Sequence, residues 1–157
     1  MARPEIKTYQ NLESAFAGES MAHIKYRYFA KLARAAGDED TAQIFEQTAD
    51  QEVMHAFGHL DLLYPAAEVT PAKALQIAIE GETYEYSEMY PGFRKTAVEE
   101  GNAAAVAEID EQISESKEHA DRFKAVLEKA AKRFAALAKV EECHANHYQK
   151  ALDAIKA

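Results

Sequence analysis

The 157-residue chain has little of the amino acids that interrupt helices or cross-link a fold. It contains one cysteine, no tryptophan, four prolines and six glycines. A single cysteine excludes a disulfide framework and a four-cysteine metal site within this chain. No stretch approaches the roughly 18 apolar residues of a membrane span. The N-terminal segment MARPEIKTYQ also lacks the apolar core of a signal peptide. We therefore expect a cytoplasmic protein with no membrane partner.

Negative charge outweighs positive charge in the sequence. Asp and Glu number 27 against 18 Lys and Arg, which gives a net charge of -9. This balance argues against a nucleic-acid partner, because the phosphates would be repelled. The 48% hydrophobic and 29% charged residues are ordinary for a globular protein, and the length favours one domain over residues 1–157. Scarce Gly and Pro beside abundant Ala, Glu and Lys predict an all-α fold.

The hydrophobic pattern predicts five helices, because apolar residues recur at helical spacing along most of the chain. Gly37 and Gly101 are expected to end helices. Thr70 followed by Pro71 has the pattern of a helix start, and Pro91 predicts a kink. The expected helices cover about residues 8–36, 38–64, 71–100, 103–127 and 129–155.

A weak internal repeat places the same two motifs in each half of the chain. The triplet 18–20, Gly-Glu-Ser, recurs as Gly-Glu-Thr at 81–83. The motif Glu-x-x-His occurs at 52–55 and again at 141–144. Each half therefore offers one helix with a Gly-Glu motif and one with Glu-x-x-His, which suggests two helix pairs related by a pseudo-twofold axis.

The motif residues lie on the apolar faces of the expected helices. Burying unpaired carboxylates there would be costly, and a pair of metal cations would remove that cost. Residues at i and i+3 share a helix face, so each Glu-x-x-His motif can supply two ligands. Two such motifs with Glu from two other helices form the ligand set of dimetal-carboxylate bundles. Mixed oxygen and nitrogen ligands favour iron or manganese. The candidate ligands are Glu19, Glu52, His55, Glu82, Glu85, Glu141 and His144, while His23, His59 and His147 are interpreted as surface or supporting groups.

The chain resembles the rubrerythrin family in four phrases that together cover most of its length. They are AFAGESMAHIKYRYFAKLARAAG, TADQEVMHAFGHL, AIEGETYEYSEMYPGFRKTAVEEG and RFAALAKVEECHANHYQKAL. The resemblance implies a ferritin-like four-helix bundle with a non-haem di-iron centre held by the seven candidate ligands. It also implies reduction of hydrogen peroxide to water, in defence against oxidative stress. In this family the counterpart of Glu85 can leave the metal and be replaced by the ligand histidine of the last helix. Tyr26 and Tyr90 match tyrosines near the family's site, so we assign Glu85, Tyr26 and Tyr90 to catalysis.

The chain departs from the family pattern in its electron-transfer part. The rubredoxin-type site of the longer members cannot be built from one cysteine. We therefore expect an external electron donor, such as a rubredoxin-like protein. The chain is similar to the shorter members of the family that lack this domain.

The chain also departs from the family pattern in the spacing of its motifs. Glu19 and Glu52 are 33 positions apart, whereas Glu82 and Glu141 are 59 apart, an excess of 59 − 33 = 26. We interpret this excess as one inserted helix at about 103–127. That segment carries the family-like phrase ISESKEHADRF, in which a histidine falls at a ligand position and a serine at the position of the ligand Glu. We favour Glu141 and His144 as the last ligands; the alternative is Glu115 with His119, beside Ser116.

An inserted helix would make the last helix run parallel to the third, whereas the two run antiparallel in the family. A crossover by the inserted helix, or an exchange of helices between two subunits, would restore the antiparallel direction. We therefore expect a homodimer, with exchanged helices as one form. Two irons are the expected cofactor, and manganese or a mixed pair also fits the ligands. Two other functions remain open, namely Fe(II) oxidation with dioxygen in iron handling and a non-enzymatic metal-binding bundle.

Overall fold

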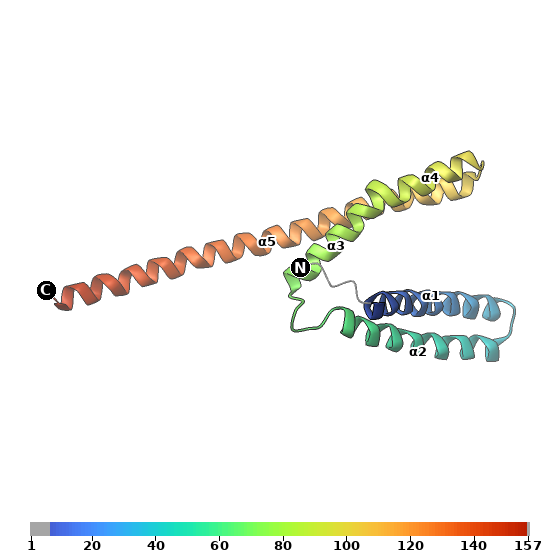
Figure 1. The fold of residues 1–157 in the computed structure, drawn as a ribbon, viewed down its shortest axis with the longest axis horizontal. Helices are drawn as coiled ribbons and strands as arrows, with labels where there is room; N and C mark the ends of the chain where they lie inside the picture. The colour runs from blue at the N-terminus through green and yellow to red at the C-terminus, as the bar shows by residue number, and fades with distance from the viewer. Residues whose placement is uncertain (1–6, 157) are drawn as a thin grey trace. The chain divides into compact units, whose positions relative to one another are not determined.

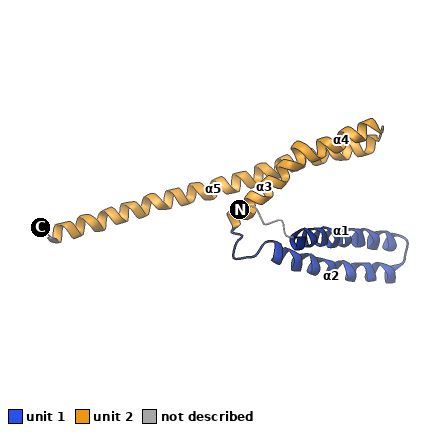
Figure 2. Ribbon diagram, in the orientation of Figure 1, with its two compact units in different colours: residues 1–70 blue, residues 71–157 orange. Residues whose placement is uncertain are grey.

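The computed structural model describes residues 7–156, which are helical almost throughout (Figure 1). The described residues contain no strand, and the all-α prediction is confirmed. The chain divides into two compact units, Met1–Thr70 and Pro71–Ala157 (Figure 2). The expectation of a single domain stays a prediction. The elements are α1 (Lys7–Ala35), α2 (Glu39–Leu63), α3 (Pro71–Tyr84), the π-helix η1 (Glu85–Met89), α4 (Tyr90–Glu99) and α5 (Ala103–Lys156).

Unit 1 is a hairpin of the two helices α1 and α2, which pack against each other along their length (Figure 1). The chain reverses at Gly37, whose φ of +83° is a left-handed conformation that favours glycine. Asp38 then caps α2, since its carboxylate accepts a hydrogen bond from the backbone N–H of Thr41 at 3.0 Å. Small residues such as Ala42 and Ala49 are fully buried between the helices, which lets the two backbones approach closely.

Unit 2 is a second hairpin, in which α3, η1 and α4 form one arm and the first half of α5 forms the other. Gly101 makes the reversal with a φ of +71°. Asn102 caps α5, because its side-chain oxygen accepts from the backbone N–H of Ala105 at 3.1 Å. Ser116 and Ala120 are the buried residues of α5 on the face that packs against the other arm.

A π-helical turn interrupts the first arm of unit 2 just before Pro91, where the sequence predicts a kink. The backbone N–H of Tyr90 donates to the carbonyl of Glu85, five residues earlier, in place of the usual four. Proline lacks an N–H and its ring clashes with the carbonyl four residues before it, so the wider turn relieves the crowding at this point. Glu85, a predicted ligand, is the first residue of η1.

The structure corrects one helix boundary. The helices predicted over 103–127 and 129–155 are a single 54-residue helix, α5. The residues at the junction, 127–131, include neither glycine nor proline, so nothing in the local sequence ends a helix there. Beyond residue 130 every described side chain of α5 is exposed. Among the described residues, no helix has both the length and the apolar character needed to cross a membrane.

Candidate metal centre

Unit 1 brings three of the predicted ligands together. Glu19 projects from α1, and Glu52 and His55 project from the facing side of α2. One ligand atom from each residue lies within 4.8 Å of the other two. His55 and Glu52 are one helical turn apart, and their Nδ1 and Oε2 atoms are 3.0 Å apart. Among the described residues this is the one group of three or more His, Cys, Asp or Glu side chains with such spacing.

The two carboxyl groups of this cluster affect each other's protonation. A hydrogen bond with Glu52, together with partial burial, raises the pKa of the Glu19 carboxyl. Hydrogen bonds with Glu19 and His55 lower the pKa of the Glu52 carboxyl. Two neighbouring carboxylates cannot both ionise without repulsion, so a shared proton stabilises the pair. A cation would take the place of that proton, which is the arrangement that a metal site requires.

The neighbouring side chains of unit 1 fix the helices around this cluster. His23 Nδ1 lies 2.8 Å from the backbone carbonyl oxygen of Ala49, so this half-buried histidine links α1 to α2. It therefore supports the scaffold, as its position one turn from Glu19 suggests. Tyr26, which the resemblance places near the site, packs its ring on Phe45 at a centroid distance of 5.8 Å.

Unit 2 brings two other predicted ligands to α5. Glu82 Oε1 lies 3.4 Å from Nδ1 of His119. The hydroxyl of Ser116 donates a hydrogen bond of 3.0 Å to Glu85 Oε2. Ser116 is only 4% exposed, so this hydrogen bond is shielded from water. The α5 residues that face the two carboxylates are therefore Ser116 and His119, a pair with the same i, i+3 spacing as Glu52 and His55.

One carboxylate oxygen in unit 2 is left without a partner. Glu82 Oε2 is buried and accepts no hydrogen bond from the described residues. An unpaired buried acceptor of this kind costs about 1–3 kcal/mol, more when it is charged. A cation bound at this oxygen would remove the penalty, so the residues present fit a metal ion.

Tyr90 lies close to the same carboxylates. Burial raises the pKa of its phenol, and the negative charges of Glu85, Glu108 and Glu82 raise it further. Tyr90 therefore keeps its proton and is a hydrogen-bond donor beside the predicted ligands. Its role in catalysis stays a prediction.

The predicted ligands Glu141 and His144 lie elsewhere on α5. Their side chains are 76% and 58% exposed, and the contact between them is an ion pair of 3.7 Å. At about 1.5 Å per residue, His144 lies about 37 Å along the helix from His119. Unit 2 by itself therefore does not bring Glu141 and His144 to Glu82 and Glu85, and their role as ligands stays a prediction. Of the alternative ligand pair, Glu115 and His119, the histidine faces Glu82, whereas Glu115 is exposed.

Ser116 is the contact that the sequence did not assign to the site. Its signal in the sequence is the motif Ser-x-x-His, in which a serine stands at the position of the ligand Glu. The π-turn that carries Glu85 was also not predicted, although Pro91 marked its place.

Comparisons with known proteins show which family the chain resembles over most of its length. The family described as Rubrerythrin matches residues 10–127. A rubrerythrin from Porphyromonas gingivalis is 36% identical over 132 residues, which cover 77% of this chain and 66% of that protein. Nigerythrin from Nitratidesulfovibrio vulgaris is 37% identical over 128 residues, covering 74% and 63%. A solved structure of fully reduced, all-ferrous nigerythrin is 35% identical, covers 82% of this chain and 70% of that one, and gives a TM-score of 0.41.

These comparisons also mark where the likeness stops. The chain spans about two thirds of the length of the curated relatives it matches. The family match ends at residue 127, close to the point where α5 loses its neighbours within unit 2. The exposed half of α5 therefore lies outside the matched region.

Proposed function

The chain belongs to the rubrerythrin family of di-iron proteins, and we propose that it is an oxidoreductase that reduces hydrogen peroxide to water. The observation that carries the proposal is the convergence of Glu19, Glu52 and His55 within 4.8 Å in unit 1. A cluster of two carboxylates and one imidazole between packed helices is suited to a transition metal.

The residues that would hold metal are two carboxylates and one imidazole in each unit. In unit 2 they are Glu82, Glu85 and His119, of which Glu82 has the unpartnered buried oxygen. Oxygen and nitrogen donors of this kind hold iron, and they also accept manganese. A bound iron pair would supply the two electrons that convert hydrogen peroxide to two molecules of water.

The other groups near the carboxylates would manage protons. Reduction of hydrogen peroxide consumes two protons in addition to two electrons, so the site needs proton donors. Tyr90 holds its phenolic proton at neutral pH, because burial and the surrounding carboxylates raise its pKa. Glu19, whose pKa is raised by the hydrogen bond with Glu52, would instead serve as a metal ligand in unit 1. Ser116 orients Glu85 through the hydrogen bond to Oε2.

The electrons must come from outside the described site. One cysteine cannot form a four-cysteine iron site, and Cys143 is exposed on α5. We include in the proposal an external electron donor, such as a rubredoxin-like protein. We also include a homodimer as the working form of the protein.

The proposal is tested by mixing the iron-loaded, reduced protein with hydrogen peroxide or with dioxygen in a stopped-flow instrument. We expect two irons per chain and oxidation that is faster with peroxide. Faster oxidation by dioxygen, with iron uptake that continues beyond two per chain, would instead support iron handling. A metal-loaded protein that reacts with neither oxidant would support a purely structural metal site.

A further inference from the structure

His59 is a half-buried histidine of α2 that has no role in the metal site described so far. It stands one helical turn after His55 and two turns after Glu52, so α2 carries the pattern Glu-x-x-His-x-x-x-His. From the sequence alone His59 is interpreted as a surface or supporting group. Two histidines at i and i+4 share one face of a helix, however, and helical zinc sites use this spacing to hold a single cation.

The alignment of the two helices of unit 1 fixes which part of α2 faces Glu19. The ring of His23 on α1 contacts the backbone carbonyl oxygen of Ala49 on α2. Glu19 is four residues before His23, and the helices run antiparallel (Figure 1). It therefore lies opposite a point about four residues after Ala49, which is between Glu52 and His55.

The natural lean of helical side chains brings His59 toward the same point. Side chains of an α-helix lean toward the N-terminus of their own helix. In an antiparallel pair Glu19 therefore leans toward the part of α2 that holds His59, and His59 leans back toward His55. The two side chains approach each other from opposite directions, at the level of the turn between His55 and His59.

The electrostatics of Glu19 agree with this placement. A hydrogen bond with Glu52 is the main cause that raises the pKa of the Glu19 carboxyl, and partial burial and the charge of Glu52 add to it. The positive forms of His55 and His59 act in the opposite direction and lower the same pKa. The charges of both histidines therefore reach this one carboxyl group.

The ring of His59 has no partner that would hold it away from the cluster. Its ligand atoms lie outside the group formed by Glu19, Glu52 and His55, whose atoms come within 4.8 Å of one another. No hydrogen bond, ion pair or ring contact joins His59 to another described residue. A move of the ring between staggered rotamers, toward the three ligands, therefore breaks no interaction of these kinds.

We propose that His59 is a fourth ligand of the metal ion in unit 1, together with Glu19, Glu52 and His55. His59 thereby adds a residue to the metal site of the proposed function and depends on that function. The two carboxylates balance the charge of a divalent cation, and two neutral imidazoles complete a set of two oxygen and two nitrogen donors. All four ligands come from α1 and α2, so unit 1 can hold this ion by itself.

A fourth ligand makes the two units unequal in their choice of metal. Unit 2 offers one imidazole, that of His119, beside Glu82 and Glu85. Imidazole ligands suit zinc and copper, whereas carboxylates suit manganese. The first equivalent of Zn(II) or Cu(II) should therefore enter unit 1.

The test combines a titration of the metal-free full chain with Zn(II) and a count of the imidazoles bound to one equivalent of Cu(II). Pulsed electron paramagnetic resonance gives this count, and we expect two. His59→Ala should leave one imidazole on copper and weaken Zn(II) binding by about 10- to 100-fold. His59→Phe keeps a ring but has no nitrogen, so the same losses in this variant would show ligation and exclude a packing effect.

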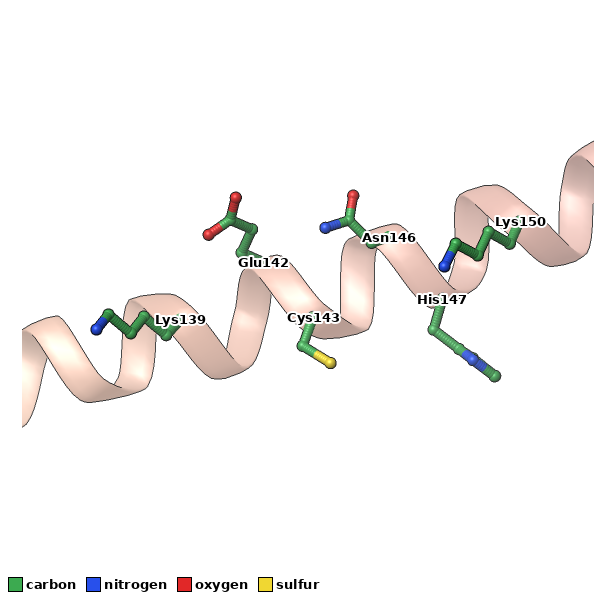
Figure 3. Close-up of a pocket in the computed structure, with 6 residues that line it drawn as sticks. All are labelled: Lys139, Glu142, Cys143, Asn146, His147 and Lys150. Atoms are coloured by element: carbon green, nitrogen blue, oxygen red, sulfur yellow. The ribbon is translucent and has the colours of Figure 1, made fainter.

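The matched control is His147, an exposed histidine of α5. Figure 3 shows it one helical turn after Cys143, on a stretch of helix that carries Lys139 and Lys150 as well. A thiolate and an imidazole at this spacing can take up a soft cation themselves, so every variant also carries Cys143→Ser. His147→Ala removes an imidazole from the other unit and should change neither the count on copper nor the Zn(II) affinity.

Glu52→Gln distinguishes failure of this inference from failure of the proposed function. If Glu52→Gln weakens Zn(II) binding but the two His59 variants keep the native affinity and two imidazoles on copper, His59 is not a ligand, and the site of unit 1 stands without it. If none of these substitutions changes binding, unit 1 holds no metal ion, and the proposed function loses its main support as well. Circular dichroism checks that the variants keep the helix content of the native chain.

Discussion

The two helical hairpins are built around the same turn but differ in what they carry. Each reverses at a glycine in the left-handed conformation, Gly37 or Gly101. Each next residue, Asp38 or Asn102, caps the second helix by accepting the N–H three residues on. The turns are therefore equivalent, and the difference between the units lies further along the helices.

The clusters of the two units show that difference. In unit 1 the second helix presents Glu52 and His55 to Glu19, so two carboxylates and an imidazole converge. In unit 2 the residues on α5 with the same i, i+3 spacing are Ser116 and His119. Ser116 supplies no carboxylate, and its hydroxyl instead donates a hydrogen bond to the carboxylate of Glu85. The same arrangement of two helices can therefore hold a metal ligand at this position, as with Glu52, or a residue that orients another ligand, as with Ser116.

The largest expected effect comes from removing the shared carboxylate of unit 1. Glu52→Gln keeps the size of the side chain but removes the charge that contacts both Glu19 and His55. We expect metal affinity to fall by more than about 100-fold, beyond the range for loss of a supporting group. Metal titration followed by mass spectrometry of bound iron measures it. Glu39→Gln, which changes a carboxylate paired with Arg34, is the control and should bind metal normally.

The next effect concerns the long continuous helix α5, a feature of unit 2 that unit 1 does not have. Glu128→Pro places proline in the interior of α5, where it costs about 3 kcal/mol of local helix stability. Backbone amides just after residue 128 should therefore lose protection from hydrogen exchange. The same substitution at a true junction between two helices would leave exchange unchanged, and that result would restore the predicted boundary.

A smaller effect is expected at the residue that distinguishes the two clusters. Ser116→Ala removes the hydroxyl that holds Glu85, and we expect metal affinity to fall by about 10-fold. Ser116→Thr retains a hydroxyl and should recover most of the affinity, provided that its methyl group fits the buried position. Calorimetric titration with Mn(II) or Fe(II) measures both variants. Equal affinities for the native, Ala and Thr proteins would show that the hydrogen bond has no role in metal binding.

The smallest effect concerns the ion pairs beside the two turns. Arg34 bonds Glu39 and Glu46 in unit 1, and lowers the pKa of both carboxyls below their ordinary value of 4.5. Arg34→Gln should lower the melting temperature by a few degrees, because these groups are largely exposed. A carboxyl group whose pKa is lowered by folding stabilises the folded state at pH values above its ordinary pKa. This stabilisation is lost as the pH falls through the lowered pKa.

The difference in melting temperature between the native protein and Arg34→Gln is therefore expected at pH 7, and it should shrink as the pH falls below 4.5 and vanish once both carboxyls are protonated. Arg94→Gln provides the matched change in unit 2, where Arg94 bonds Asp110 and lowers the pKa of that carboxyl. A gap that persists unchanged in acid would show that the arginines act through packing of their alkyl stems.

Much of the fold follows from local sequence. The two glycines, Gly37 and Gly101, together with the helix-favouring composition, predicted both turns at the right residues. The Glu-x-x-His spacing predicted that Glu52 and His55 share a face, because that relation is contained within one helical turn. The partner of Glu52 on α1, Glu19, was also predicted from the Gly-Glu motif and its apolar neighbours.

The fold of the second half of the chain was less accessible from sequence. The motif at 141–144 matches the motif at 52–55 more completely than Ser116 with His119 does, so sequence similarity alone favoured it. Two residues on the opposite arms of a hairpin face each other when they are about the same number of helical turns from Gly101. By this rule His119, and not His144, lies beside Glu82. The break predicted near residue 128 had no local signal, and the helix is continuous there.

The sequence by itself determined the helical fold, the two turns and the kind of side chain that gathers between the helices, since these depend on contacts within a few residues. The tertiary structure decided which turn of α5 faces Glu82 and Glu85, and it placed Ser116 against Glu85. It also decided that Glu85 begins a π-turn. Each of these depends on the alignment of segments distant in sequence, and side-chain packing across the hairpin fixes that alignment.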